Sequence, residues 1–338
     1  MKVAVYYSNA DIRIEERPKP RISSGEILVK MKASGICGTD VMEWYRMKKA
    51  PRILGHEMAG EIAAIGRGVK GLKKGDRVFV SHHVPCYRCH LCSQGNYTAC
   101  GSLHTGNYDP GGFSEFIRIP KDNVKYGTFL LPAAITYEDA AMIEPLGCVV
   151  AGQKQLGLKR GQTVLIIGSG VSGILHIQLA KLKKAKIIAV DINKYKLQKA
   201  SEFGADYVID AWKYSVDKLK SLNDGRMADV VIICASAQQA VDNAISSVER
   251  KGKILFFAVS ETDIRIPSLR FWRDEISVTS SYGASPDDLK EAIRLIASKK
   301  INVRKMITHK VKLSYISKGF QIASESKESL KVVIVPDN

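Results

Sequence analysis

A glycine-rich hexapeptide, Gly168-Ser169-Gly170-Val171-Ser172-Gly173, constrains the fold of this chain more than any other stretch. It has the pattern GxGxxG and lies between an apolar run, 164–167, and apolar residues at helical spacing that continue to Leu182. An acidic residue, Asp191, closes the next apolar run about twenty residues later. A strand, a glycine turn and a helix, followed by an acid at that distance, predict a dinucleotide-binding turn.

The positions of the hexapeptide have distinct expected roles. Gly168 allows the tight turn, Gly170 lets the backbone approach a pyrophosphate, and Gly173 lets the helix pack close to the strand. The helix N-terminus supplies partial positive charge for the phosphates. Asp191 is expected to bind the adenosine ribose and repel a 2′-phosphate, which favours NAD over NADP, although the lysines that follow it could weaken this preference. The predicted cofactor-binding residues are Gly168, Gly170, Val171, Ser172, Gly173, Asp191, Ile192 and Lys196.

Strand-like and helix-like runs alternate from about residue 163, which is typical of a parallel sheet covered by helices on both faces, an α/β arrangement. We therefore assign residues 148–288 to a nucleotide-binding domain. The expected strands are 164–167, 187–190, 207–209, 230–234 and 254–257, and the expected helices are 174–182, 194–203 and 238–248.

The first part of the chain, residues 1–147, has a different rhythm of short strand-like runs punctuated by glycine. This pattern predicts a compact β-rich, barrel-like domain. Near the C-terminus, a predicted helix over 287–298 precedes a last apolar strand over 330–335. That strand needs a partner, so we expect residues 289–338 to return to the first domain. The expected strands of the first domain are 3–7, 26–32, 61–65, 77–80 and 116–119.

Four of the seven cysteines form a tight cluster with the spacing Cys86-x2-Cys89-x2-Cys92-x7-Cys100. A disulfide framework is the alternative, but seven is an odd number and the chain is not a small secreted domain. Four thiolates saturate a tetrahedral zinc ion and leave no position for a substrate. The loop 86–100 is therefore predicted to hold a structural zinc ion.

A second candidate metal site has ligands of mixed type. Cys37, His56 and Glu57 offer a thiolate, an imidazole and a carboxylate, and three protein ligands with one open position are typical of catalytic zinc. Glu144 is a further candidate ligand, and its alternatives are a helix-start carboxylate or a partner of a buried arginine. Asp40 is expected to orient the ring of His56, because ligating imidazoles usually donate their other N–H to an acceptor.

Composition bounds the possible functions. The chain has 338 residues, 45% of them hydrophobic and 25% charged, which is typical of a soluble globular protein of two domains. No export signal or membrane span is evident, so we expect a cytoplasmic protein. The formal charge is +17, but the lysines are scattered and no nucleic-acid-binding pattern occurs. A solvated basic surface is the favoured interpretation, and a phosphorylated substrate is the alternative.

Taken together, these motifs resemble the zinc-dependent medium-chain alcohol dehydrogenases, in the branch of sorbitol-like polyol, butanediol and threonine dehydrogenases. The resemblance covers essentially the whole chain. It implies a GroES-like catalytic domain, a Rossmann domain, one catalytic and one structural zinc ion, and a homodimer or homotetramer. It rests on Gly35-Ile36-Cys37-Gly38-Thr39-Asp40, Gly55-His56-Glu57, the four cysteines, Glu144-Pro145-Leu146-Gly147 and the GxGxxG hexapeptide.

The resemblance also assigns roles within the mixed site. It implies that Cys37, His56 and either Glu57 or Glu144 hold the catalytic zinc, and that the hydroxyl of Thr39 touches the substrate oxygen. Relatives commonly carry a proton-relaying histidine five residues after the ligand cysteine, where this chain has Met42. The path of the proton beyond Thr39 is therefore open, through cofactor ribose hydroxyls or water.

The leading hypothesis is a dehydrogenase that transfers a hydride between a secondary alcohol, such as a polyol or vicinal diol, and NAD. The alternatives within the enzyme class are an L-threonine dehydrogenase and a sugar-alcohol-phosphate dehydrogenase. The alternative outside it is a regulatory protein that binds zinc and a nucleotide. Residues near the zinc-binding turn and after the cysteine cluster are candidates to line the substrate pocket: Trp44, Tyr45, Ser102, His104, Thr105 and Asn107.

Overall fold

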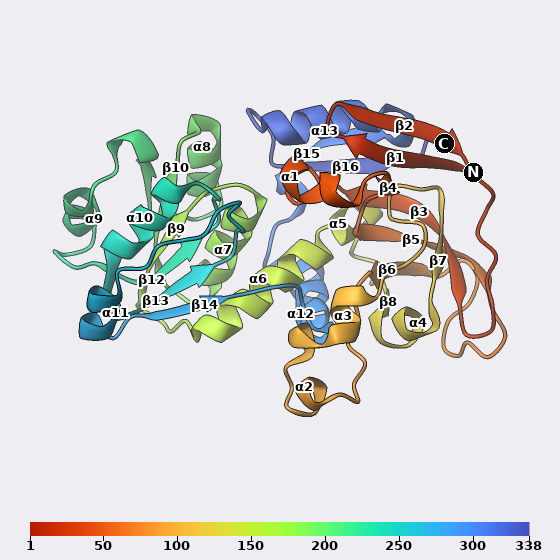
Figure 1. The fold of residues 1–338 in the computed structure, drawn as a ribbon, viewed down its shortest axis with the longest axis horizontal. Coiled ribbons are helices and arrows are strands. Elements are labelled where there is room, and N and C mark those ends of the chain that lie inside the picture. Colours follow the sequence, from red (N-terminus) through yellow and green to blue (C-terminus); the bar gives the residue numbers. More distant parts are fainter. Residues whose placement is uncertain (338) are drawn as a thin grey trace. The chain divides into compact units, whose positions relative to one another are not determined.

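A computed structural model describes residues 1–337 and divides them into two compact units, coloured along the sequence in Figure 1. The first unit comprises Met1–Gly147 and Gly283–Asn338, and the second comprises Cys148–Tyr282. The second unit thus begins at residue 148 as predicted but ends before residue 288. The segment after Tyr282 packs with the first unit, because Leu289 and Ala284 lie against Gly147. Among the described residues, no helix is both long and apolar enough to cross a bilayer.

The first unit is built from two sheets that are mainly antiparallel. One has the strand order β2-β1-β4, and the larger has the order β15-β16-β3-β5-β6-β8, with β7 paired to β3. The expectation of a β-rich domain is confirmed. Its strands are β1 (Lys2–Ser8), β2 (Asp11–Glu16), β3 (Ile27–Gly35), β4 (Arg52–Ile53), β5 (Glu57–Ile65), β6 (Arg77–Ser81), β7 (Phe116–Ile119), β8 (Thr128–Leu130), β15 (Ile307–Lys312) and β16 (Lys331–Val335).

Helices of the first unit are mostly short and connect the strands. The longer C-terminal helix α12 begins with a capping box, in which Ser285 and Asp288 each accept from the other's backbone N–H. Helix α13 and strand β15 lie in a stretch to which the sequence pattern assigned no element. The helices are α1 (Glu43–Arg46), α2 (His90–Ser93), α3 (Gly101–Thr105), α4 (Lys121–Gly127), α5 (Tyr137–Ala140), α6 (Ile143–Leu156, which runs into the second unit), α12 (Pro286–Ala297) and α13 (Ile316–Glu325).

The second unit contains a six-stranded sheet, all parallel, with the order β11-β10-β9-β12-β13-β14. The predicted parallel sheet is confirmed, although β13 begins at Val248 and not near 254. Its strands are β9 (Thr163–Ile167), β10 (Lys186–Asp191), β11 (Tyr207–Asp210), β12 (Ala228–Ile233), β13 (Val248–Phe256) and β14 (Ser277–Ser280), and its helices are α7 (Val171–Leu182), α8 (Lys194–Glu202), α9 (Val216–Leu222), α10 (Gln238–Ser247) and α11 (Ser268–Asp274).

The C-terminal strand β16 completes the core of the first unit. It pairs antiparallel with the end of β3, where Val333 lies opposite Gly35. Lys331, at its first position, is only 1% exposed and forms an ion pair with Glu57 of β5, which is fully buried. The ammonium of Lys331 also donates to the carbonyl oxygen of Ile36 at 3.1 Å. The C-terminal strand thus belongs to the first unit.

Strand β5 begins earlier than the sequence pattern predicts, at Glu57 and not at residue 61. The strand extends back to Glu57 because this residue lies opposite Gly35 of β3. A Cβ at Gly35 would lie 2.0 Å from a carboxylate oxygen of Glu57, so the absence of a side chain there makes room for this acid.

Lys331→Met tests the stability that the buried ion pair provides. Removing the cation leaves the Glu57 carboxylate buried without its partner, and we expect the free energy of unfolding to fall by about 3–5 kcal/mol. Burial alone would lower the pKa of Lys331, but the charges of Glu57 and Cys37 raise it above 10.5. The ion pair therefore contributes fully below that pH and is lost only as the pH rises through the higher folded-state pKa.

The measurement is urea unfolding at pH 8. Lys312→Met removes an exposed lysine from β15 and serves as the control, with an expected change within about 0.5 kcal/mol. Equal stability of the Lys331→Met and Lys312→Met proteins would contradict the importance of the pair.

Candidate active site

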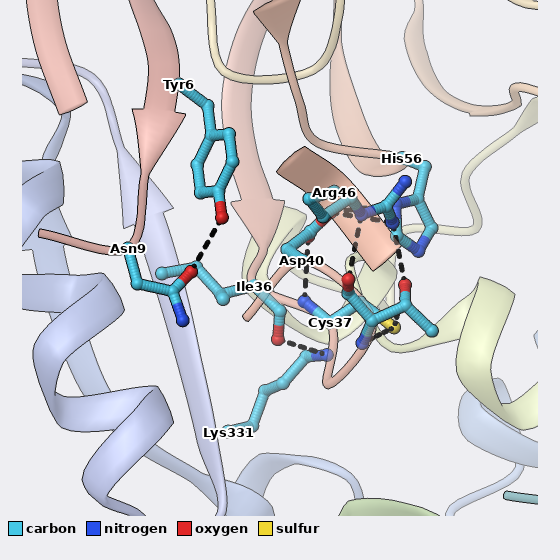
Figure 2. Close-up of polar contacts among 9 residues, drawn as sticks. Tyr6, Asn9, Ile36, Cys37, Asp40, Arg46, His56 and Lys331 are labelled. Carbon is cyan, nitrogen blue, oxygen red and sulfur yellow. Dashed lines mark hydrogen bonds and ion pairs between the residues drawn. The ribbon is translucent and has the colours of Figure 1, made fainter. Parts of the chain in front are cut away.

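The turn that follows β3 carries the first part of the mixed ligand set. Cys37 lies just beyond β3, and its backbone N–H donates to Asp40 Oδ2 at 3.1 Å, which closes the turn. Tyr6 donates to Asn9 at 2.9 Å (Figure 2). Asn9 in turn donates to the carbonyl of Val41 at 2.8 Å, which attaches the next segment to the end of β1. The turn is therefore fixed at both ends by contacts with strands.

Cys37, His56 and Glu57 are brought together as predicted. One potential ligand atom from each lies within 4.8 Å of the others, a geometry that could hold a metal ion. Neither carboxylate oxygen of Glu57 accepts a hydrogen bond within the described chain, although Oε2 forms the ion pair with Lys331. A thiolate, an imidazole and a buried carboxylate are a donor set that suits zinc.

Glu144 lies near this set but does not belong to the group of three. It is on the first turn of α6, and its charge raises the pKa of both Tyr108 and Lys331, after the larger effects of burial and, for Lys331, of Glu57 and Cys37. The structure therefore places the alternative carboxylate close to the ligand set. It does not choose between Glu57 and Glu144.

The structure places Asp40 beside His56. Asp40 is fully buried, and its Oδ1 lies 3.5 Å from Nδ1 of His56. Burial lowers the pKa of His56, but the neighbouring charges of Asp40 and Cys37 outweigh it and raise that pKa well above 6.5. Burial raises the pKa of Asp40, and the charges of His56 and Arg46 reverse this to a lowered pKa. Asp40 therefore remains ionised against the imidazole ring.

Thr39 contacts the sulfur atom of Cys37. Its hydroxyl donates to Cys37 Sγ at 3.3 Å, and its backbone N–H approaches the same sulfur at 3.5 Å. Arg46, at the end of α1, donates from Nε to the carbonyl of Thr39 at 2.7 Å and from Nη2 to the Thr39 hydroxyl at 2.8 Å (Figure 2). Nη2 also lies 3.2 Å from Asp40 Oδ1. Sequence reasoning did not find Arg46, which no motif marks.

Two further buried groups near the ligand set were also not predicted. The His82 ring lies 5.0 Å from the His56 ring and 6.3 Å from the Tyr108 ring. Burial, reinforced by neighbouring cationic groups, lowers the pKa of His82 well below 6.5, so this ring is neutral. Within residues 1–337, Nδ1 of His82 and the hydroxyl of Tyr108 are buried and have no hydrogen-bond partner. The sequence signal was a histidine pair, 82–83, at the end of an apolar strand.

The residues proposed from sequence to line the pocket lie at or near the surface. Helix α1, which holds Trp44 and Tyr45, has no buried residue, so these rings do not pack under the barrel. On α3, His104 is exposed and contacts the carbonyl of Thr98 at 3.0 Å. Ser102, Thr105 and Asn107 are exposed as well. None of these contacts assigns the six residues to a substrate pocket.

The four clustered cysteines are brought together in one loop. Their sulfur atoms lie within 4.8 Å of one another, and Cys89 Sγ lies 3.8 Å from Cys100 Sγ. All seven cysteines are free of disulfide bonds. Burial raises the pKa of Cys92 to about 12, whereas backbone N–H groups of Cys86 and Leu103 overcome burial and lower the pKa of Cys100 to about 6. The donor set fits a four-thiolate metal site better than it fits a disulfide.

The nucleotide turn has the predicted geometry in the second unit. Gly168 has φ +97°, and a Cβ at Gly173 would lie 1.9 Å from the carbonyl oxygen of Gly168. A Cβ at Gly170, by contrast, would meet no atom within 4 Å, so the backbone there is open to a ligand. Asp191 ends β10, and its carboxylate accepts from the backbone N–H of Ser169 at 2.6 Å and of Asn193 at 2.8 Å.

The remaining predicted cofactor residues lie around the same turn. Val171 and Ser172 begin α7, directly after Gly170. Ile192 follows Asp191 and is 65% exposed, and Lys196 lies in the first turn of α8, where its N–H donates to Asn193. The structure therefore gathers all of these residues at the carboxyl ends of β9 and β10, which is where parallel sheets bind nucleotides.

Comparison with known proteins agrees with this geometry. Residues 23–132 match the family described as "Alcohol dehydrogenase GroES-like domain", and residues 172–298 match "Zinc-binding dehydrogenase". The chain is 31% identical to a sorbitol dehydrogenase of Halalkalibacterium halodurans over 99% of this chain and 98% of the relative.

Two solved structures have the same fold across their whole length. The 2R,3R-butanediol dehydrogenase of Bacillus subtilis has a TM-score of 0.87 with 27% identity, covering 99% of each chain. The galactitol-1-phosphate dehydrogenase of Escherichia coli has a TM-score of 0.88 with 28% identity, covering 99% of this chain and 100% of the other. With its GroES-like and nucleotide-binding units, the chain belongs to the zinc-dependent medium-chain alcohol dehydrogenase family and is an enzyme of that class.

Proposed function

We propose that this enzyme oxidises a secondary alcohol of a polyol or vicinal diol to a ketone, with NAD as the hydride acceptor. The carbinol C–H bond breaks, its hydride passes to the nicotinamide and the hydroxyl proton passes to solvent. The main support for this proposal is the position of the Thr39 hydroxyl. It lies 3.3 Å from the sulfur of Cys37, which belongs to a group of potential ligands that offers a thiolate, an imidazole and a carboxylate.

Catalytic zinc fits this set. Cys37 and His56 would hold it with Glu57 or Glu144, and Asp40 fixes the orientation of the His56 ring. When bound, zinc supplies a Lewis acid that polarises the carbinol oxygen and lowers the pKa of the alcohol. Thr39 then orients that oxygen through its hydroxyl.

Arg46 limits what the Thr39 hydroxyl can do. Because Nη2 of Arg46 donates to Thr39 Oγ1, one lone pair of that oxygen is occupied. The hydroxyl proton of Thr39 would then point at the substrate oxygen and no longer at the sulfur of Cys37. Thr39 thus serves as a donor that stabilises negative charge on the substrate, and Arg46 strengthens it electrostatically. Met42 holds the position where relatives carry the relay histidine, so the proton leaves through water or ribose hydroxyls.

Buried polar groups without partners support a hydroxyl-rich substrate. The hydroxyl of Tyr108 and Nδ1 of His82 are both enclosed beside the ligand set and lack a partner within residues 1–337, where an unsatisfied group is costly. Neighbouring hydroxyls of a polyol would satisfy both. The sorbitol and butanediol dehydrogenases among the relatives act on molecules of this kind, as their names state.

NAD fits the second unit. The open backbone at Gly170 would receive the pyrophosphate, and Asp191, already held by two N–H groups, keeps lone pairs for ribose hydroxyls. A 2′-phosphate would meet the same carboxylate, which supports NAD over NADP. We further propose that Cys86, Cys89, Cys92 and Cys100 hold a structural zinc ion, and that the enzyme is a cytoplasmic homodimer or homotetramer.

The test is NADH formation at 340 nm with sorbitol, galactitol, 2,3-butanediol and L-threonine, before and after zinc chelation. We expect chelator-sensitive oxidation of polyols or the diol. In His56→Ala, one zinc ligand is gone, so turnover should fall by about 10³-fold or more while NAD affinity changes little.

A full rate in zinc-depleted His56→Ala protein would refute the mechanism. Preference for L-threonine over every polyol would refute the substrate class and leave the reaction type standing.

Cys89→Ser tests the structural site separately. Removing one of four thiolates should lower the zinc content from two to one per chain and reduce the midpoint of thermal unfolding, because metal binding is coupled to folding. Zinc content is measured by elemental analysis and unfolding by calorimetry. Cys148→Ser, outside both candidate sets, is the control and should change neither quantity. Two zinc ions and an unchanged midpoint in Cys89→Ser would argue against the site.

A further inference from the structure

Two arginines converge on the turn that carries Thr39. Arg46 is largely buried, and its Nε and Nη2 atoms are engaged by Thr39 and Asp40. Its remaining terminal nitrogen, Nη1, makes no hydrogen bond or ion pair with residues 1–337. One edge of the Arg46 guanidinium therefore contacts Thr39 and Asp40, whereas Nη1 on the other edge has no polar partner among the described residues.

Arg52 is the second cation. It lies on β4, opposite Tyr6 of β1, and is half-buried. Burial, and next the charge of Arg46, lower the pKa of its guanidinium, while the charge of Asp40 raises it in part, so Arg52 lies near both groups. In the part of the chain that the structure describes, Arg52 has no hydrogen bond and no ion pair.

The acidic groups nearby are already engaged. Asp40 pairs with Arg46, contacts His56 and accepts the N–H of Cys37. Glu43 accepts the backbone N–H of Asn9 at 2.9 Å.

Two of the cations beside the ligand set have an acidic partner in direct contact. Arg46 is balanced by Asp40, and Lys331 is balanced by Glu57. Arg52 forms no ion pair with a described residue, and the charge of Asp40, which already pairs with Arg46, acts on it only in part. Keeping a partly desolvated cation unpaired is unfavourable, and an anion would compensate it.

We infer that Arg52 and the free edge of Arg46 bind an anionic group on the substrate, a phosphate ester or a carboxylate, a few bonds from the oxidised hydroxyl. This inference rests on the proposed function and narrows its substrate class. The planar guanidinium matches both anions and can bind either through two N–H donors. Arg46 Nη2 lies 2.8 Å from the Thr39 hydroxyl. The anion site would therefore adjoin the hydroxyl that is proposed to contact the reacting oxygen of the substrate.

The test compares neutral and anionic forms of the same carbon chain. We would measure kcat/KM for sorbitol, sorbitol 6-phosphate, galactitol, galactitol 1-phosphate and gluconate. At least one anionic compound should exceed its neutral counterpart by about tenfold to a hundredfold, the usual range for hydrogen bonds to charged groups. Preference for a phosphate ester or for gluconate identifies which anion the site takes.

Arg52→Met should abolish this preference by raising KM for the anionic compound, with kcat and the constants for neutral polyols nearly unchanged. Arg52→Lys keeps the charge and should retain part of the preference. Lys49→Met removes an exposed charge from the same segment and is the matched control, with the preference expected to remain. Thermal unfolding of each variant confirms that it folds.

A second measurement does not depend on turnover. Inorganic phosphate should bind the wild-type enzyme in calorimetric titration and bind Arg52→Met at least about tenfold more weakly. Equal kcat/KM for neutral and anionic substrates, with equal phosphate binding by both proteins, would overturn the anion site while leaving the dehydrogenase assignment intact. Absence of any chelator-sensitive activity would count against the proposed function, and phosphate binding would still decide the anion site.

Discussion

The ion pair between Lys331 and Glu57 is the interaction on which the first unit depends. It joins residues from the two ends of the chain, because β16 brings Lys331 beside β3 and β5. Both side chains are buried, so neither charge can be solvated by water, and each makes the other tolerable. The same ammonium group donates to the carbonyl of Ile36, directly before Cys37. The C-terminal strand therefore fixes the start of the turn that carries Cys37 as well as the sheet.

The residues of the motifs could be predicted because each motif is defined by residue types at a fixed local spacing. The four cysteines, the pair His56 and Glu57, and the glycine turn all lie where their motifs predicted. Strand periodicity likewise located most strands of both units, with errors at their ends. Those errors have physical causes: β5 begins at Glu57 because it pairs with Gly35, a register that no local pattern contains.

Contacts between distant segments escaped prediction. Lys331 was included in an apolar strand, although a lysine within such a run requires a buried acid, and the acid lies 274 residues earlier (331 − 57). Arg46 was missed because a short, exposed-looking segment gives no sign that its guanidinium turns back to Thr39. Tyr108 and His82 could be linked to the site only after folding placed their rings near His56.

The differences between the two cysteine-containing sites follow from their donor sets. Four thiolates in one loop satisfy a tetrahedral ion completely, so that site can stabilise the loop but cannot bind a substrate. The set around Cys37 offers three donors, and cations lie on two sides of it, Lys331 at Glu57 and Arg46 at Thr39. Lys331 keeps the buried Glu57 carboxylate charged, whereas the charge of Arg46 at the Thr39 hydroxyl would favour a substrate oxygen that becomes negative as its proton leaves. Arg46 would thus act by charge at the oxygen itself, whereas a histidine at position 42 would act by proton transfer.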